Sequence, residues 1–212
     1  RENDFRRYLS VRYSYPLWAV DQAERQLGYD GAEMMMRCTG QDYVSVRVNR
    51  LKADVDDVKT ALIRAGGSVA TSPLHPLALR VCGLSNITAL PEYRGGLLSM
   101  QSEASIVFAD QIPDGCQKVM DLCAAPGGKT CAIAERLPAA QILSYDIHPH
   151  RVELIQKQAQ RLGLTNIAFA VQDARVRMEQ HLDSADAVLV DAPCSGLGTA
   201  AKRPDVKLNR SF

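Results

Sequence analysis

Long hydrophobic runs are missing from this 212-residue chain. Its apolar stretches are short, such as Ala187 to Val190, whereas a membrane-spanning helix needs roughly 20 apolar residues in succession. The first residues are charged and interrupted by Pro16, which does not fit a secretory signal peptide. With 46% hydrophobic residues, the sequence predicts a globular chain with no membrane partner, expected in the cytoplasm.

Closely paired cysteines are missing as well. Zinc sites need ligands at short spacing, so no metal site is expected. Reduced thiols are a simpler interpretation than a disulfide framework in a chain long enough to form a core. The six cysteines, none in a C-x-x-C pair, are Cys38, Cys82, Cys116, Cys123, Cys131 and Cys194.

A strong excess of one charge is also absent, because the net charge is +1. Composition therefore gives no global signal for a nucleic-acid partner. The chain contains no internal repeat, but its pattern changes near 113–115. The region before this join predicts a small α+β module. Its expected elements are helices over 16–27, 32–38, 54–65 and 102–110 and strands over 44–48, 77–81 and 96–100.

Two of these elements show their buried sides in the sequence. Valines alternate through 44–48, so we expect one face of this strand to be apolar. Asp54 is placed to cap the helix that follows, and two glycines at 66–67 end it. The predicted apolar stripe of this helix is Val55, Val58, Leu62 and Ile63.

The region after the join alternates strands and helices. This alternation predicts a parallel sheet with right-handed crossovers. The expected strands are 119–123, 141–146, 166–171 and 186–191, and the expected helices are 127–137 and 149–162.

Carboxylates follow three of these strands. Asp146 ends the second, Asp173 follows the third by two residues, and Asp191 ends the fourth. Each alone is explained by a cap or by solvation, and Asp173 could cap a short helix over 175–181. Ligands bind beyond the carboxyl ends of parallel strands, so their joint placement predicts a binding site.

A glycine turn connects the first of these strands to its helix. The segment 124–129 reads A-A-P-G-G-K, which lets the backbone approach a ligand at a helix N-terminus. The spacing is neither G-x-G-x-x-G nor a phosphate loop, so a dinucleotide or ATP fits poorly.

Two motifs in this region carry a family resemblance. D-L-C-A-A-P-G-G-K-T at 121–130 and D-A-P-C-S-G at 191–196 resemble the Sun/Fmu (RsmB-like) family of RNA 5-methylcytosine methyltransferases, which is related to the NSUN proteins. Segments 16–18, 43–51, 86–88 and 96–103 resemble the upstream parts of that family, including its RNA-binding module.

The resemblance implies an α/β, Rossmann-like methyltransferase fold with an incomplete parallel sheet, preceded by a small α+β RNA-binding module. The implied division is a helical linker region at 1–40, the module at 41–113 and the N-terminal half of the catalytic domain at 114–212. Arg1 to Val11 is expected to be a linker left from a preceding helical domain. Such a domain is typical of enzymes that act on small-subunit ribosomal RNA.

The implied cofactor is S-adenosyl-L-methionine, and the resemblance assigns its contacts. Asp146 is expected to hold the ribose hydroxyls, Asp173 to face the adenine amino group, and Asp191 to lie beside the sulfonium and the target base. The residues expected around the methionine part and the ribose are Cys123, Ala124, Ala125, Pro126, Gly127, Gly128 and Lys129.

Methylation of carbon 5 of cytosine needs a thiolate that adds to carbon 6 of the base. From the residues alone, Cys194 is a candidate nucleophile, or else a small thiol packed behind a turn. The resemblance implies a third role, in which Cys194 assists product release and a later T-C-S motif carries the nucleophile. The sequence contains no T-C-S, and Cys131 is expected inside a helix.

The chain alone is therefore expected to bind the cofactor weakly or not at all and not to methylate RNA. Its fourth strand is expected to form a bare apolar edge, which favours self-association. Ribosomal RNA is the favoured partner, with tRNA as the alternative. Two other functions stay open: a non-catalytic RNA-binding protein that keeps the scaffold, and a ribose methyltransferase, against which the D-A-P-C segment argues.

Overall fold

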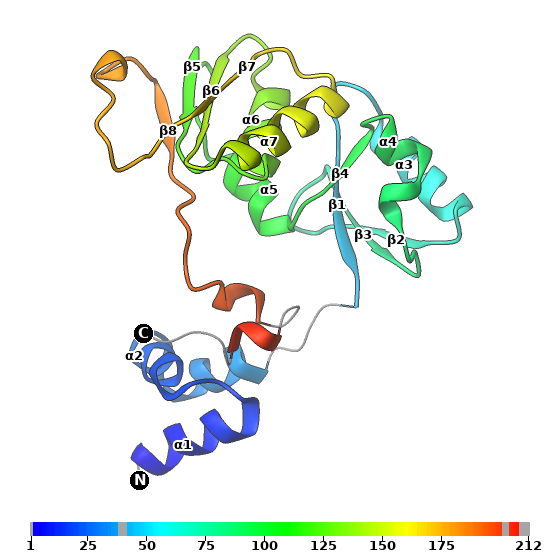
Figure 1. The fold of residues 1–212 in the computed structure, drawn as a ribbon. Helices are drawn as coiled ribbons and strands as arrows, with labels where there is room; N and C mark the ends of the chain where they lie inside the picture. The colour runs from blue at the N-terminus through cyan, green and yellow to red at the C-terminus, as the bar shows by residue number, and fades with distance from the viewer. Residues whose placement is uncertain (1, 38–41, 201–203, 208–212) are drawn as a thin grey trace. The chain divides into compact units, whose positions relative to one another are not determined.

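The computed structural model describes residues 2–37, 42–200 and 204–207. The chain forms two compact units (Figure 1), one from Arg1–Asp42 with Pro193–Phe212 and the other from Tyr43–Ala192. Within the described residues, no helix is long and apolar enough to cross a membrane. The division at 40 and 113 that the sequence predicts stays a prediction.

The first unit is built around two helices, α1 (Glu2–Tyr13) and α2 (Leu17–Arg37), with the short 3-10 helices η3 (Leu197–Thr199) and η4 (Pro204–Lys207). Most of the segment Arg1 to Val11 lies in α1, and its expected origin as a linker stays a prediction. The side chain of Leu9 is fully buried in a cluster with Val20 and Met36, and this burial stabilises the helix.

The helix α2 joins two helices that the sequence predicts separately, over 16–27 and 32–38. The backbone is not helical at Gly28, where φ is 71°, so a kink marks the predicted break. Glycine reaches this left-handed φ without steric cost. Cys38, the expected end of the second helix, lies outside the described residues.

A four-stranded antiparallel sheet forms the first part of the second unit. Its strand order is β2-β3-β1-β4, and Val46, Val48 and Leu62 lie in its core. The strands are β1 (Val44–Val48), β2 (Ser68–Thr71), β3 (Ala78–Cys82) and β4 (Leu98–Met100), accompanied by α3 (Val55–Arg64), η1 (Ile87–Ala89) and α4 (Pro91–Arg94).

This part differs from the sequence prediction in several places, and neither η1 nor α4 was predicted. The strand β2 was not predicted, because its residues are mostly exposed and carry no apolar alternation. Ile63 was expected on the buried stripe of α3 but is 50% exposed, whereas Val58 and Leu62 are buried. The predicted cap is confirmed, since the side chain of Asp54 accepts a hydrogen bond from the N–H of Val55.

The rest of the second unit is a parallel sheet, as predicted, and its strand order is β7-β6-β5-β8. β8 lies at one edge of the sheet, and Val188 within it and Val190 after it are more than half exposed, which confirms the predicted apolar edge. The elements are β5 (Lys118–Asp121), β6 (Gln141–Asp146), β7 (Ile167–Val171), β8 (Ala187–Leu189), α5 (Glu103–Ala109), α6 (Gly128–Arg136), α7 (Pro149–Leu162) and η2 (Glu179–His181).

The two sheets of the second unit are joined by close backbone packing. The side-chain amide of Asn49 donates hydrogen bonds to the carbonyls of Gly96, at 3.0 Å, and Leu162, at 3.1 Å. Gly96 has a φ of +75°, and a Cβ there would lie 2.1 Å from the carbonyl oxygen of Arg161. Only glycine therefore fits where the antiparallel part meets the end of α7.

Candidate cofactor-binding site

The carboxyl ends of the parallel strands lie at one edge of the sheet. Asp121 at the end of β5 pairs with Ser144 of β6, and Asp146 at the end of β6 pairs with Val171 of β7. Asp121 is 1% exposed and Asp146 is 4% exposed. Asp191 was predicted to end the fourth strand, but β8 ends at Leu189, so Asp191 lies in the segment that follows.

The loop between β5 and α6 is fixed by a tight turn. Gly127 has a φ of +103°, and a Cβ there would lie 3.1 Å from the side chain of Ile155. Its N–H donates to the carbonyl of Ala124, whose own N–H donates to the carbonyl of Tyr145 in β6. No side chain caps α6, so the first N–H groups of this helix stay available for a ligand.

A pocket of about 200 Å³ opens beside this loop. It brings together seven of the predicted site residues: Cys123, Ala124, Ala125, Pro126, Gly128, Lys129 and Asp191. Sequence reasoning did not assign five further lining residues to the site: Met100, Gln101, Ser102, Ser105 and Asp121. Gly127, Asp146 and Asp173 do not line this pocket, although they flank the same strand ends.

The missed residues lie mainly at the start of α5. The hydroxyl of Ser102 accepts a hydrogen bond from the N–H of Ser105 and caps this helix. The sequence signal was present, because Ser102 is placed to cap the predicted helix over 102–110, which lies before the first strand of the parallel sheet. The segment 96–103 was assigned to the RNA-binding module. Only the packing of α5 against α6 shows that this region also lines the pocket.

Burial dominates the electrostatics of Asp121. It raises the pKa of this carboxyl to about 6, because charge is disfavoured away from water. Hydrogen bonds from the hydroxyl of Thr130, at 2.6 Å, and from the N–H of Cys123, at 3.4 Å, oppose the rise. Asp121 is thus a buried negative charge at neutral pH that a cationic ligand group can compensate.

Asp191 and Lys129 form an ion pair at the mouth of the pocket. The side chain of Asp191 is 53% exposed and that of Lys129 is 19% exposed. An exposed pair of this kind adds little stability. Its effect is positional, because it holds one carboxylate oxygen of Asp191 toward the N-terminal turn of α6.

The other two predicted carboxylates have different surroundings. Asp146 accepts a hydrogen bond from the N–H of His148 at 3.1 Å. Asp173 accepts from the backbone and guanidinium of Arg175, and these hydrogen bonds lower its pKa to about 2. A helix cap is not its role, because the short helix there is confined to η2 and begins after Met178.

The cysteines differ in their access to solvent. Cys131 lies inside α6, as predicted, and burial raises the pKa of its thiol to about 12. Burial also raises the pKa of Cys123. Cys194 is exposed and belongs to the first unit. Among the described residues, no cluster of three or more His, Cys, Asp or Glu side chains has the arrangement of a metal site.

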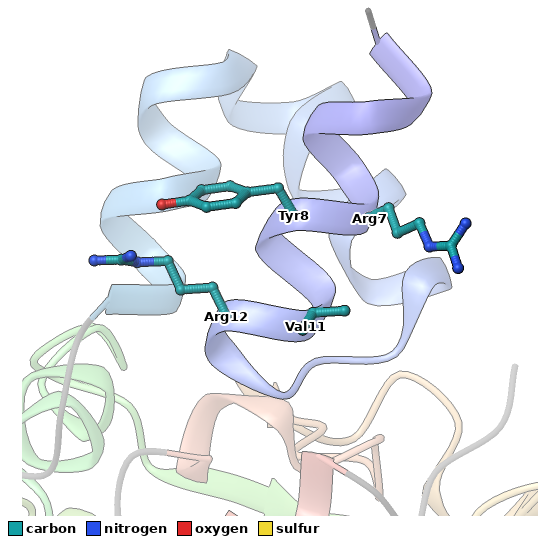
Figure 2. Close-up of a pocket in the computed structure, with 4 residues that line it drawn as sticks. All are labelled: Arg7, Tyr8, Val11 and Arg12. Carbon is teal, nitrogen blue, oxygen red and sulfur yellow. The ribbon is translucent and has the colours of Figure 1, made fainter.

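A separate shallow hollow lies on α1. Figure 2 shows Tyr8 and Arg12 pointing to one side of the helix and Arg7 and Val11 to the other. The guanidinium of Arg12 lies 5.6 Å from the ring centroid of Tyr8. All four residues are exposed, so this hollow has no buried polar group of the kind that marks a ligand site. The pocket beside α6 does, since Asp121 is buried there.

Comparisons with known proteins agree with this geometry. Residues 111–211 match the family model for 16S rRNA methyltransferase RsmB/F, and residues 15–88 match that of the RsmF/B-like ferredoxin-like domain. A probable ribosomal RNA small subunit methyltransferase B of Bacillus subtilis is 34% identical over 208 residues, which cover 96% of this chain and 46% of the relative.

Solved structures show the same fold. The crystal structure of PH0851 superposes with a TM-score of 0.89 at 31% identity, covering 96% of this chain and 47% of that chain. The structure of NSun6 from Pyrococcus horikoshii gives a TM-score of 0.80 at 20% identity, covering 93% of this chain and 74% of that chain. This chain spans about half the length of the curated relatives that it matches. The chain has a ferredoxin-like domain followed by a Rossmann-like methyltransferase fold, and each is matched by its own family model. This chain therefore belongs to the RsmB/F family of ribosomal RNA methyltransferases.

Proposed function

We propose that this chain is the cofactor-binding part of an enzyme that methylates carbon 5 of cytosine in RNA. The observation that carries the proposal is the pocket in which the glycine turn before α6 meets Asp121 and Asp191. Because the chain spans about half the length of its relatives, the activity and substrate of the whole protein are part of the proposal.

The residues present fit S-adenosyl-L-methionine. The buried carboxylate of Asp146 suits a pair of ribose hydroxyls, which need acceptors at a strand end. The turn from Cys123 to Lys129 brings the free N–H groups of α6 to the pocket, where they suit a carboxylate. When bound, this cofactor supplies the methyl group on its sulfonium. Asp191 is proposed to lie beside that cation and the target base, held there by Lys129.

Asp173 is proposed to accept from the adenine amino group. Its carboxylate is engaged by Arg175, whose side chain is 83% exposed. A guanidinium this exposed can turn into solvent at small cost, since solvent-exposed ion pairs contribute little stability. The pair therefore keeps Asp173 ionised and leaves it available to a ligand.

The target base is proposed to be activated by a cysteine outside this sequence. Cys131 is buried with a pKa of about 12, and a thiol that stays protonated is a poor nucleophile. Cys194 is exposed and is proposed to assist product release. Ribosomal RNA is the proposed substrate, because the Bacillus subtilis relative is named as a small subunit ribosomal RNA methyltransferase, with tRNA as the alternative.

Calorimetric titration with S-adenosyl-L-methionine tests the cofactor site. Because this chain itself forms the pocket, we propose that it binds the cofactor measurably, in place of the weak or absent binding expected from the sequence. Asp146→Asn keeps an acceptor for His148 but removes the charge, and it is expected to lower the affinity at least tenfold. Asp57→Asn, an exposed change in α3, is the matched control and is expected to bind as the wild type does. Equal affinity of the Asp146 variant would contradict the proposed site.

The reaction is tested by release of tritium from RNA labelled at carbon 5 of cytosine. Because the sequence has no T-C-S motif, this chain is expected to release none. Sustained release by the purified chain would show that one of its own cysteines is the nucleophile. Methyl transfer without tritium release would point to the ribose or to another base atom.

A further inference from the structure

One buried donor in the pocket has no partner in the chain. Gln101 is 8% exposed and lines the pocket, and its Nε2 group makes no hydrogen bond. The orientation of this amide is fixed, because its Oε1 accepts from the Nε of Arg47 at 2.8 Å. A buried N–H group without an acceptor destabilises the folded state, so an acceptor is expected from outside the chain.

Other buried polar atoms also lack partners, but they lie elsewhere. In the described part of the chain they are Ser45 Oγ, Arg47 Nη2, Glu135 Oε1, Arg136 Nε, Ser144 Oγ and His181 Nδ1, and none of these residues lines the pocket. The amide of Gln101 lies against the first residue of α6, since a Cβ at Gly128 would be 3.8 Å from Nε2.

The groups around this amide have complementary charges. Donors come from Nε2 of Gln101 and from the first turn of α6, whose N–H groups have no side-chain cap. Acceptors come from the carboxylates of Asp121 and Asp191 on the same pocket. A ligand group that carries both a carboxylate and an ammonium satisfies both sets. A neutral base edge leaves the buried carboxylate of Asp121 without an ion-pair partner, whereas Asp191 is paired with Lys129.

We infer that Gln101 binds the α-carboxylate of the amino-acid end of S-adenosyl-L-methionine through Nε2, with Asp121 facing the α-ammonium group. This inference rests on the proposed function and adds a residue from outside the methyltransferase motifs. Gln101 follows β4 of the antiparallel sheet, so the part of the second unit next to the methyltransferase sheet completes the cofactor pocket. Arg47 is a positioning residue that holds the amide with its donor toward the ligand.

Two ligands separate this inference from the proposed function. S-adenosylhomocysteine has the amino-acid end, and 5′-methylthioadenosine has the same nucleoside and sulfur without it. Gln101→Glu keeps the acceptor for Arg47 and removes the donor. It is expected to weaken S-adenosylhomocysteine about ten- to a hundredfold and to leave methylthioadenosine within about twofold of the wild type.

A second variant and a matched control complete the test. Gln101→Met removes the donor without adding a charge, although it also removes the acceptor of Arg47, and it is expected to show the same selective loss. Gln158→Glu is the control, because Gln158 also accepts from an arginine Nε, that of Arg161, but its Nε2 donates to Ser99. It is expected to bind both ligands normally.

Each outcome of these titrations decides the inference. If the Gln101 variants bind S-adenosylhomocysteine as tightly as the wild type, or lose both ligands equally, Gln101 does not bind the carboxylate and the proposed function stands. If the wild-type chain binds neither ligand at millimolar concentration, the proposed cofactor site of this chain fails, and the inference fails with it.

Discussion

The ionised carboxylate of Asp121 lines the cofactor pocket and is expected to lower the stability of the folded chain. Burial raises the pKa of this carboxyl from 3.8 to about 6, and each pKa unit corresponds to about 1.4 kcal/mol. Ionised Asp121 therefore costs the folded state about 3 kcal/mol at neutral pH. Asp121→Asn removes this cost but loses one of two acceptors, worth about 1 kcal/mol, and is expected to stabilise the chain by about 2 kcal/mol at pH 7.5.

The pH dependence has a definite sign. A carboxyl with a raised folded pKa binds more protons in the folded state than in the unfolded state between its two pKa values. Stability from this group therefore falls as pH rises from about 4 to about 6 and is constant above. The advantage of Asp121→Asn over the wild type is expected to widen by about 1–2 kcal/mol between pH 5 and pH 7.5.

Urea unfolding at both pH values measures this difference. Asp186→Asn is the control, because Asp186 accepts from the N–H groups of Gln117 and Lys118, which lower its pKa. Asp186 is ionised in both states at pH 5 and above, so its effect is expected to be equal at the two values. A difference for Asp121→Asn that stays constant with pH, or narrows as pH rises, would refute the account of Asp121.

Two further changes test the junction between the two sheets. Arg47→Ala leaves the fully buried carboxylate of Glu135 without its partner and is expected to destabilise the chain by about 3–5 kcal/mol; adding Glu135→Gln should recover part of the loss in denaturant unfolding. Gly96→Ala brings a Cβ to 2.1 Å from backbone and is expected to lower the melting temperature more than Gly66→Ala, which also has a positive φ but nothing within 4 Å.

The elements of the parallel sheet were predicted well because their signals are local. The strand over 141–146 and the helix over 149–162 have the predicted bounds. Pro149 begins the helix, and Gly163 ends it with a φ of 77°, which few other residues adopt. Such signals depend only on neighbours in sequence, so they are readable without the fold.

The elements that were missed depend on partners distant in sequence. The strand β2 is mostly exposed and is defined by its pairing with β3. Residues 1–11 carry several charges, and their helix is supported by Leu9 in the core of the first unit. The pairing of β2 and the burial of Leu9 cannot be read from the local sequence. Secondary-structure propensity is a weak determinant once tertiary packing contributes.

Only part of the cofactor pocket was predicted, because its other lining residues are brought there by partners distant in sequence. The valines of β1 indicate one buried face, and the opposite residues, Ser45 and Arg47, are polar as if they faced water. They are 5% and 2% exposed, because this second face meets the methyltransferase part. Arg47 reaches Gln101 across 54 positions and Glu135 across 88 positions of sequence. A buried arginine needs both partners, so the contacts that join the two domains are the same ones that orient the donor of Gln101 in the pocket.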